Sequence, residues 1–189
     1  MRKLIICFTA LLFSQFSFGQ TVQDNATIPV SVTLNSILRL QVKTGGNIQF
    51  VFNTMDQYAH GIGNTNGTTT TFTVASSKSF TVSLGAEDDA LYGVETGDRT
   101  GATGNIPLSV IQYTVVGTAA MLNDAATLMP LTQVSAATYQ IIDAGVAGPA
   151  DAARQFDIEW EAGTVTNLLA LNAPADVYIT NVFLNLQAY

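Results

Sequence analysis

Few side chains in this sequence could carry nucleophilic or acid–base catalysis. His60 is the only histidine, so a Ser-His-Asp or Cys-His arrangement would have to include it. No Gly-x-Ser-x-Gly motif, which would present a nucleophilic serine, occurs in the chain. His60 stands in the run Tyr58-Ala59-His60-Gly61, which we interpret as a loop. We therefore expect no catalytic residues, and a protein that is not an enzyme.

Three carboxylates, Asp157, Glu159 and Glu161, alternate along one stretch that has the pattern of a strand. They would share one face, as the paired carboxylates of a glycoside hydrolase could. The residues between and before them are apolar and include the only tryptophan, Trp160. A strand with one face in the core and the other in solvent has this same pattern. We favour that interpretation, with the acids exposed and Trp160 in the core.

A second acidic cluster is formed by Glu87, Asp88 and Asp89, with Glu95 and Asp98 nearby. Hard cations such as Ca²⁺ bind clustered carboxylate oxygens, but the alternate spacing of an EF-hand loop is absent here. Zinc would lack its favoured ligands, because the chain has one histidine and one cysteine. We predict no metal and no cofactor. If a cation does bind, Glu87, Asp88 and Asp89 are where we expect it.

Three tyrosines, Tyr58, Tyr92 and Tyr113, are the candidates for an exposed aromatic platform that could bind sugars. They keep open an alternative function, that of a carbohydrate- or small-ligand-binding β-sandwich module. Burial of all three side chains would count against that alternative, because a buried ring cannot stack on a ligand.

The first 19 residues have the pattern of a signal peptide. Arg2 and Lys3 precede an apolar run over residues 4–13, and a small-residue site follows that ends at Gly19. The apolar run is shorter than the 18 or more residues that a membrane-spanning helix needs. Cys7 is the only cysteine and lies within the leader, so the mature chain has no thiol and no disulfide. We predict a secreted protein of the periplasm, cell surface or extracellular space.

The charge balance of the mature chain limits the classes of partner that it can bind. Removing Arg2 and Lys3 with the leader leaves five of the seven cations against 14 acids, a net charge of −9. Nucleic-acid binding needs a basic surface, so we expect no nucleic acid as a partner. No second apolar run is long enough to cross a membrane, so we also expect no membrane insertion of the mature chain.

Residues 20–189 alternate short strand-like runs with turn clusters, which predicts one all-β domain. About nine or ten strands with little helix are best buried as an antiparallel β-sandwich, either Ig-like or jelly-roll-like. The strands are predicted over residues 26–34, 37–43, 48–52, 69–74, 79–84, 106–116, 138–143, 155–160 and 176–189, with a short one near 91–94.

The first predicted strand, residues 26–34, has the clearest alternation in the chain. One face carries five apolar side chains, and Pro29 on the other face cannot donate a ladder hydrogen bond, so we place this strand at a sheet edge or near its own start. The five apolar residues are Ala26, Ile28, Val30, Val32 and Leu34.

The layout of the mature chain resembles secreted bacterial β-sandwich subunits, namely the spore coat protein U and pilin-like fimbrial families. The resemblance is carried by the leader followed by two alternating runs, by Phe72-Thr73-Val74-Ala75-Ser76-Ser77, and by Trp160-Glu161-Ala162-Gly163-Thr164 before a closing strand. The paired cysteines of the family are absent here. Members of these families are non-enzymatic, and often one subunit's terminal strand fills a groove of its neighbour. The resemblance implies residues 26–34 as the donated strand; alternatively, this strand completes its own sheet.

The function expected from the sequence is that of an exported, non-enzymatic structural or adhesion-type surface protein. It would act through protein–protein contacts as a homo-oligomer or polymer. In the most specific form of this prediction, the protein is a fimbria- or filament-forming subunit that uses residues 26–34 as its assembly strand.

Overall fold

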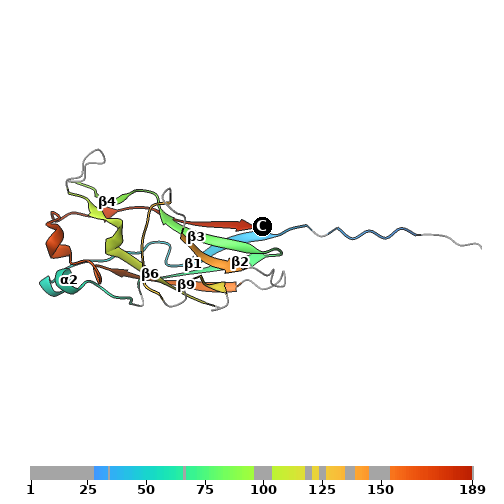
Figure 1. The fold of residues 1–189 in the computed structure, drawn as a ribbon, viewed down its shortest axis with the longest axis horizontal. Helices are drawn as coiled ribbons and strands as arrows, with labels where there is room; N and C mark the ends of the chain where they lie inside the picture. The colour runs from blue at the N-terminus through green and yellow to red at the C-terminus, as the bar shows by residue number, and fades with distance from the viewer. Residues whose placement is uncertain are drawn as a thin grey trace, which may run out of the picture. The chain divides into compact units, whose positions relative to one another are not determined.

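The computed structural model describes residues 28–33, 35–65, 67–95, 104–117, 121–123, 127–134, 139–144 and 154–188. The chain divides into two units, Met1–Leu34 and Asn35–Tyr189. In the first unit, residues 28–33 belong to no helix or strand, whereas Ala26, Leu34 and the predicted leader lie outside the described residues. All elements named below belong to the second unit (Figure 1).

The described part of the second unit contains three sheets, and every neighbouring pair of strands is antiparallel. The largest sheet has the order β1-β2-β9-β6-β7, the second has the order β11-β3-β8, and a small third sheet has the order β10-β4-β5. The strands are β1 (Leu38–Thr44), β2 (Thr69–Ser76), β3 (Phe80–Ala86), β4 (Ala90–Gly93), β5 (Ile106–Pro107), β6 (Ile111–Val116), β7 (Met129–Pro130), β8 (Tyr139–Ala144), β9 (Arg154–Ala162), β10 (Tyr178–Ile179) and β11 (Val182–Ala188).

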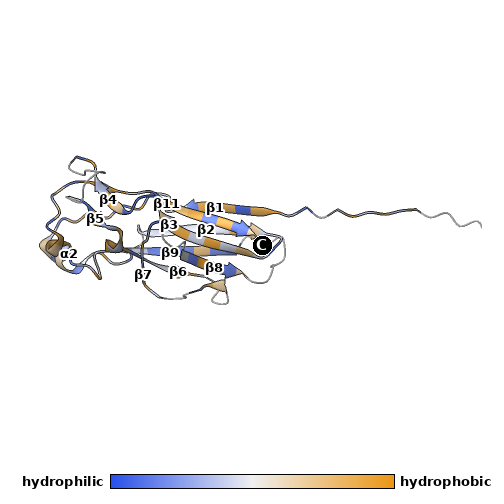
Figure 2. Cartoon of the chain, turned by 45° about the horizontal axis from the view of Figure 1, so that its top comes forward, coloured by the Kyte–Doolittle hydropathy of each residue, from blue (hydrophilic) through white to orange (hydrophobic). Residues whose placement is uncertain are grey.

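The fold is all-β and sandwich-like, because the alternating strands must bury one face each. Figure 2 shows polar and apolar residues alternating along strands such as β2 and β3. In β2 every second side chain is buried, and β9 follows the same rule. Phe72 of β2 stacks on Phe156 of β9 with ring centroids 5.6 Å apart, and both side chains are fully buried. The predicted fold class is confirmed.

Three predicted strands of the second unit are different in the structure. Residues 48–52 do not return beside β1, whose partner is instead β2; Ile48, Phe50 and Phe52 bury themselves partly against the core without forming a ladder. The run 106–116 is divided by a 3₁₀ turn, Leu108–Val110, because β5 and β6 belong to different sheets. The last strand is likewise divided into β10 and β11, which join different sheets.

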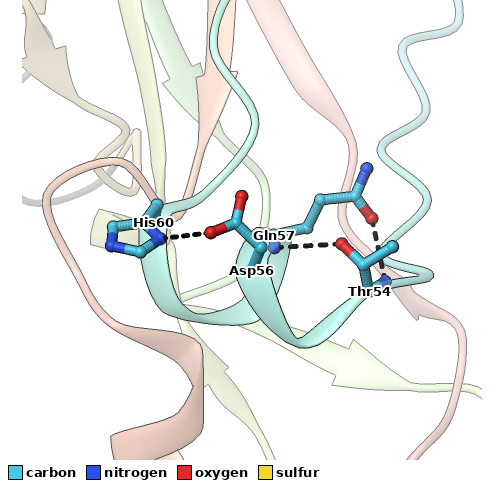
Figure 3. Close-up of polar contacts among 4 residues, drawn as sticks. All are labelled: Thr54, Asp56, Gln57 and His60. Atoms are coloured by element: carbon cyan, nitrogen blue, oxygen red, sulfur yellow. Dashed lines mark hydrogen bonds and ion pairs between the residues drawn. The ribbon is translucent and has the colours of Figure 1, made fainter.

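One short helix, α2 (Met55–His60), includes His60, which we predicted to lie in a loop. A six-residue helix is too short to be stable by itself, so its ends must be held. Gln57 N–H donates to Thr54 Oγ1 at 3.2 Å, and Thr54 N–H donates to Gln57 Oε1 at 3.1 Å, a reciprocal capping box (Figure 3). Among the described residues, no helix is long and apolar enough to span a bilayer.

Candidate functional site

The most distinctive surface of the second unit lies between β1 and β11. Each of these strands is the last strand of its sheet, and the two contact each other without pairing within the described residues. Each therefore presents one edge of backbone N–H and C=O groups that no neighbouring strand of the described chain takes up. We call this region the β1–β11 groove, and define it by the apolar rows of the two strands described next.

The apolar row of β1 consists of Leu38, Leu40 and Val42, which point to the core side of the large sheet. Their partners in β2 place them there: Leu40 lies opposite Val74 and Val42 opposite Phe72, and both partners are essentially fully buried. Leu38 and Val42 are nevertheless each 42% exposed. The core side of the sheet is therefore open to solvent along its last strand.

The same arrangement occurs on β11, where Val182, Leu184 and Leu186 form the apolar row. Leu184 lies opposite Leu84 and Leu186 opposite Val82 in β3, and these partners are buried. The residues of the β11 row are themselves only partly covered. Two core-facing apolar rows thus flank one opening, each with a free strand edge.

The backbone of both edge strands directs its free groups into this opening. The carbonyl of Ile37 accepts from Ser77 N–H at 3.0 Å, and the carbonyl of Asn181 accepts from Glu87 N–H at 2.8 Å. In a strand, successive residues direct their backbone groups to opposite sides. Along residues 38–42 of β1 and along β11, the odd-numbered residues therefore bond inward to β2 and β3. The even-numbered apolar rows present their N–H and C=O groups at the open edge.

Beneath the opening is a hollow of about 1010 Å³ that reaches between the sheets. Its lining includes Leu40 and Val42 of β1, Val182 and Leu184 of β11, and Trp160 of β9. Protein interiors are normally close-packed, so a hollow of this size bordered by apolar side chains is suited to a further apolar segment. An added β-strand would fill it with side chains and would pair with the free edges.

The polar side-chain atoms of Trp160 and Thr70, which line the hollow, already form hydrogen bonds within the chain. Trp160 Nε1 donates to Thr70 Oγ1 at 2.9 Å, and Thr70 Oγ1 donates to the carbonyl of Gly45 at 2.6 Å. At one end the wall is aromatic, with Phe52 and Tyr58 in tilted contact at 5.5 Å between ring centroids. The groove is therefore suited to bind apolar side chains and backbone, and it brings no acid–base pair together.

The predicted assembly strand is only partly described. Ile28, Val30 and Val32 are 80–84% exposed, whereas Ala26 and Leu34 lie outside the described residues. Residues 28–33 therefore do not form the predicted strand with any partner in the described chain. A strand needs a neighbour to satisfy its backbone, so this alternating segment carries the pattern of a strand without its ladder.

The predicted catalytic candidates do not come together in a cavity. His60 lies in the last turn of α2 rather than in a loop, and its Nδ1 is 2.9 Å from Asp56 Oδ1 in an exposed i,i+4 pair (Figure 3). Asp157 and Glu161 lie on the outward face of β9, where they accept hydrogen bonds from Thr71 and Thr164 at 2.6 and 3.0 Å. The carboxylates of Asp157, Glu159 and Glu161 are half-buried on this face rather than exposed, and Trp160 is buried in the core as predicted.

The acidic cluster at residues 87–89 accepts hydrogen bonds from other side chains of the chain. Asn181 Nδ2 donates to Glu87 Oε2 at 2.6 Å, and Tyr92 Oη donates to Asp89 Oδ1 at 2.5 Å. In the part of the chain that is described, no three His, Cys, Asp or Glu side chains are grouped so that they could hold a metal ion. Asp98 lies outside the described residues.

The three tyrosines do not form a common aromatic platform. Tyr113 is buried and packs against Trp160, with 5.7 Å between ring centroids. Tyr58 is half-buried against Phe52, and Tyr92 is half-buried beside Asp89. The sugar-binding alternative therefore loses one of its three candidate side chains, and the remaining two are only partly accessible.

No protein-family model matches this chain. No curated protein matches it in sequence either. The groove is therefore interpreted from its own geometry. Sequence reasoning predicted strands over residues 37–43 and 176–189, but it had no signal that β1 and β11 would lie at two sheet edges beside each other.

Proposed function

We propose that the mature chain is an exported, non-enzymatic structural subunit that joins other copies of itself by strand addition. The β1–β11 groove of one copy takes residues 26–34 of another copy as an added strand. The observation that supports this most is the pair of apolar rows, Leu38 to Val42 and Val182 to Leu186, that lie half-open beside free strand edges. The chain itself carries the matching part, an exposed segment with apolar side chains at every second position.

The segment fits the groove as an additional strand would. An added strand would place Ile28, Val30 and Val32 against the apolar rows, and burial of each such side chain is worth about 1.5–3 kcal/mol. Its backbone would pair with the free edges of β1 and β11. The opposite face of the segment, with Ser31 and Thr33, is polar and would face solvent.

The test is the size distribution of the mature chain, beginning at Gln20, in solution. We expect species larger than the monomer by light scattering and filaments by electron microscopy. The double variant Val30→Asp/Val32→Asp should remain monomeric, because it places two charges in the groove. The matched control Ser31→Asp/Thr33→Asp adds the same charge to the solvent face and should assemble normally.

The single tryptophan offers a second measurement, because Trp160 lines the hollow. A synthetic peptide of residues 24–36 should change the tryptophan emission of the Val30→Asp/Val32→Asp variant, whose own segment is disabled. The same peptide with aspartate at positions 30 and 32 should leave the emission unchanged. If the wild-type chain stays monomeric and neither peptide alters the emission, the groove does not take this strand.

A further inference from the structure

A six-residue segment, residues 47–52, forms one side of the hollow without belonging to either sheet. Every residue of this segment borders the hollow. Ile48, Phe50 and Phe52 are half-buried against the core, whereas the residues between them are exposed, so the segment alternates as a strand does. In the described part of the chain, however, no backbone hydrogen bond joins residues 47–52 to another segment. We call this segment the strap.

The strap is fixed at its first end by the turn that follows β1. Gly45 lies directly against the backbone of β2, and its carbonyl accepts from Thr70 Oγ1 at 2.6 Å. A Cβ on Gly46, the next residue, would have nothing within 4 Å. The chain therefore leaves the sheet at Gly46, where a glycine between a fixed turn and an unbonded segment can rotate at low cost.

The strap is fixed at its other end by α2. Asn53 N–H donates to Gln57 Oε1 at 2.7 Å, beside the capping box that Gln57 forms with Thr54 (Figure 3). The chain that leaves the helix is joined to the large sheet, because Ile62 N–H donates to the Ala162 carbonyl at 2.7 Å and Ala162 N–H donates to the Ile62 carbonyl at 2.9 Å. The helix is therefore a firm attachment for the strap.

Between these two fixed ends, Ile48 and Phe50 hold the strap to the core through apolar contacts. Phe52 is next to the helix and packs against Tyr58 with 5.5 Å between ring centroids, so it belongs to the fixed part. A segment without a hydrogen-bond ladder and with few buried contacts opens at a lower free energy than a paired strand does. The middle of the strap is therefore the side of the hollow that can move most easily.

We propose that the strap is an autoinhibitory cover of the β1–β11 groove. In the free copy it leans over the hollow and covers apolar surface with Ile48 and Phe50, and an entering strand displaces it outward about Gly46. This inference rests on the strand addition proposed above and concerns how entry is regulated. Displacement exposes two apolar side chains, so an entering segment must bury more apolar surface than the strap gives up. The strap thereby excludes short or polar segments.

Quenching of the single tryptophan reports the position of the strap, because Trp160 also lines the hollow and the mature chain has no cysteine. A nitroxide, which quenches tryptophan at short range, is attached at Val51→Cys on the exposed face of the strap. The matched control carries the nitroxide at Met55→Cys in α2, which is exposed and lies outside the lining of the hollow.

Both labelled chains also carry Val30→Asp/Val32→Asp, which disables their own segment. Two occupants are added separately, namely the peptide of residues 24–36 and decanol, an uncharged apolar probe. Binding of each occupant is read from the Trp160 emission of the unlabelled chain. We expect both occupants to relieve the quenching from position 51 and to leave the quenching from position 55 unchanged.

The two occupants separate the strap from strand addition. Relief of quenching by decanol without any effect of the peptide would support the cover and overturn strand addition. Unchanged quenching from position 51 while the peptide binds would overturn the cover and leave strand addition standing. If neither occupant alters the emission or the quenching, both inferences are wrong.

A truncation within the strap gives the sign of its effect. Phe50→Ser removes the apolar side chain in the middle of the cover and should tighten binding of the peptide about tenfold, the factor that corresponds to about 1.4 kcal/mol of lost burial. The matched control is Gln49→Ser, whose side chain is exposed, and it should bind as the parent chain does. Weaker binding by Phe50→Ser would show that the strap is a fixed wall against which the strand packs, and would overturn the cover.

Discussion

Gly45 closes the turn after β1, and we expect its replacement by alanine to destabilise the wall of the groove. Gly45 has φ of +67°, in the left-handed region that glycine tolerates best. A Cβ at this position would overlap the carbonyl oxygen of Thr69 and would lie 2.7 Å from Thr70 Cα. Both are backbone atoms of the neighbouring strand β2, so they cannot move aside as a flexible side chain could.

The magnitude can be assembled from three contributions. The left-handed conformation costs a residue with a Cβ about 1–2 kcal/mol. A shift of the turn would also weaken the 2.6 Å hydrogen bond from Thr70 Oγ1 to the Gly45 carbonyl, worth about 1 kcal/mol. With the steric overlap, we expect Gly45→Ala to lower the free energy of unfolding by about 3 kcal/mol, which in a chain of this size lowers Tm by about 6–12 °C.

The assay is urea unfolding followed by the emission of Trp160, with Gly46→Ala as the matched control. Gly46 is the next residue, and a Cβ there would meet nothing within 4 Å. The control should stay within about 0.5 kcal/mol of the wild type. If Gly45→Ala were as stable as Gly46→Ala, the close approach of this turn to β2 would be wrong, and with it the position of β1 as the groove wall.

Three further changes test the core and the helix cap by urea unfolding. Phe72→Ala removes a fully buried ring stacked on Phe156 and should cost about 3–5 kcal/mol, whereas Gln155→Ala on the exposed face should be nearly neutral. Trp160→Phe removes the buried hydrogen bond to Thr70 Oγ1 and should lower the free energy of unfolding by about 1 kcal/mol. The unfolding of this variant is monitored by circular dichroism, because the tryptophan fluorophore is lost. Thr54→Ala should cost about 1 kcal/mol through the lost cap of α2 and Thr54→Ser should restore it; equal stability of the two variants would argue against the capping box.

The strands that the sequence predicted best are those with one face in the core and one in solvent. The pattern of β9 places Phe156, Ile158 and Trp160 in the core, and the structure buries all three. Alternation is a local signal, because successive side chains of a strand point to opposite faces. The same alternation places Leu38, Leu40 and Val42 on one side of β1, and Val182, Leu184 and Leu186 on one side of β11.

Local signals failed where the chain changes direction or sheet. Residues 48–52 alternate like a strand, yet they form no ladder, and β1 is paired instead with β2, about 30 residues further along the chain. The helix α2 is marked in the sequence by Thr54 and Gln57, three residues apart, which is the spacing of a capping box. This spacing can be seen in the sequence, but our interpretation of the run that contains His60 as a loop did not take it into account.

The sequence by itself determined the all-β class, the apolar faces of the individual strands and the alternating row within residues 26–34. The neighbours of each strand are set by hydrogen bonds between segments far apart in the chain, and no local pattern specifies them. Only the tertiary structure therefore decided that β1 and β11 end their sheets side by side. Their apolar rows are half-open because each strand is paired along one edge alone. A face that would be core in the middle of a sheet stays partly exposed at the margin of the sheet.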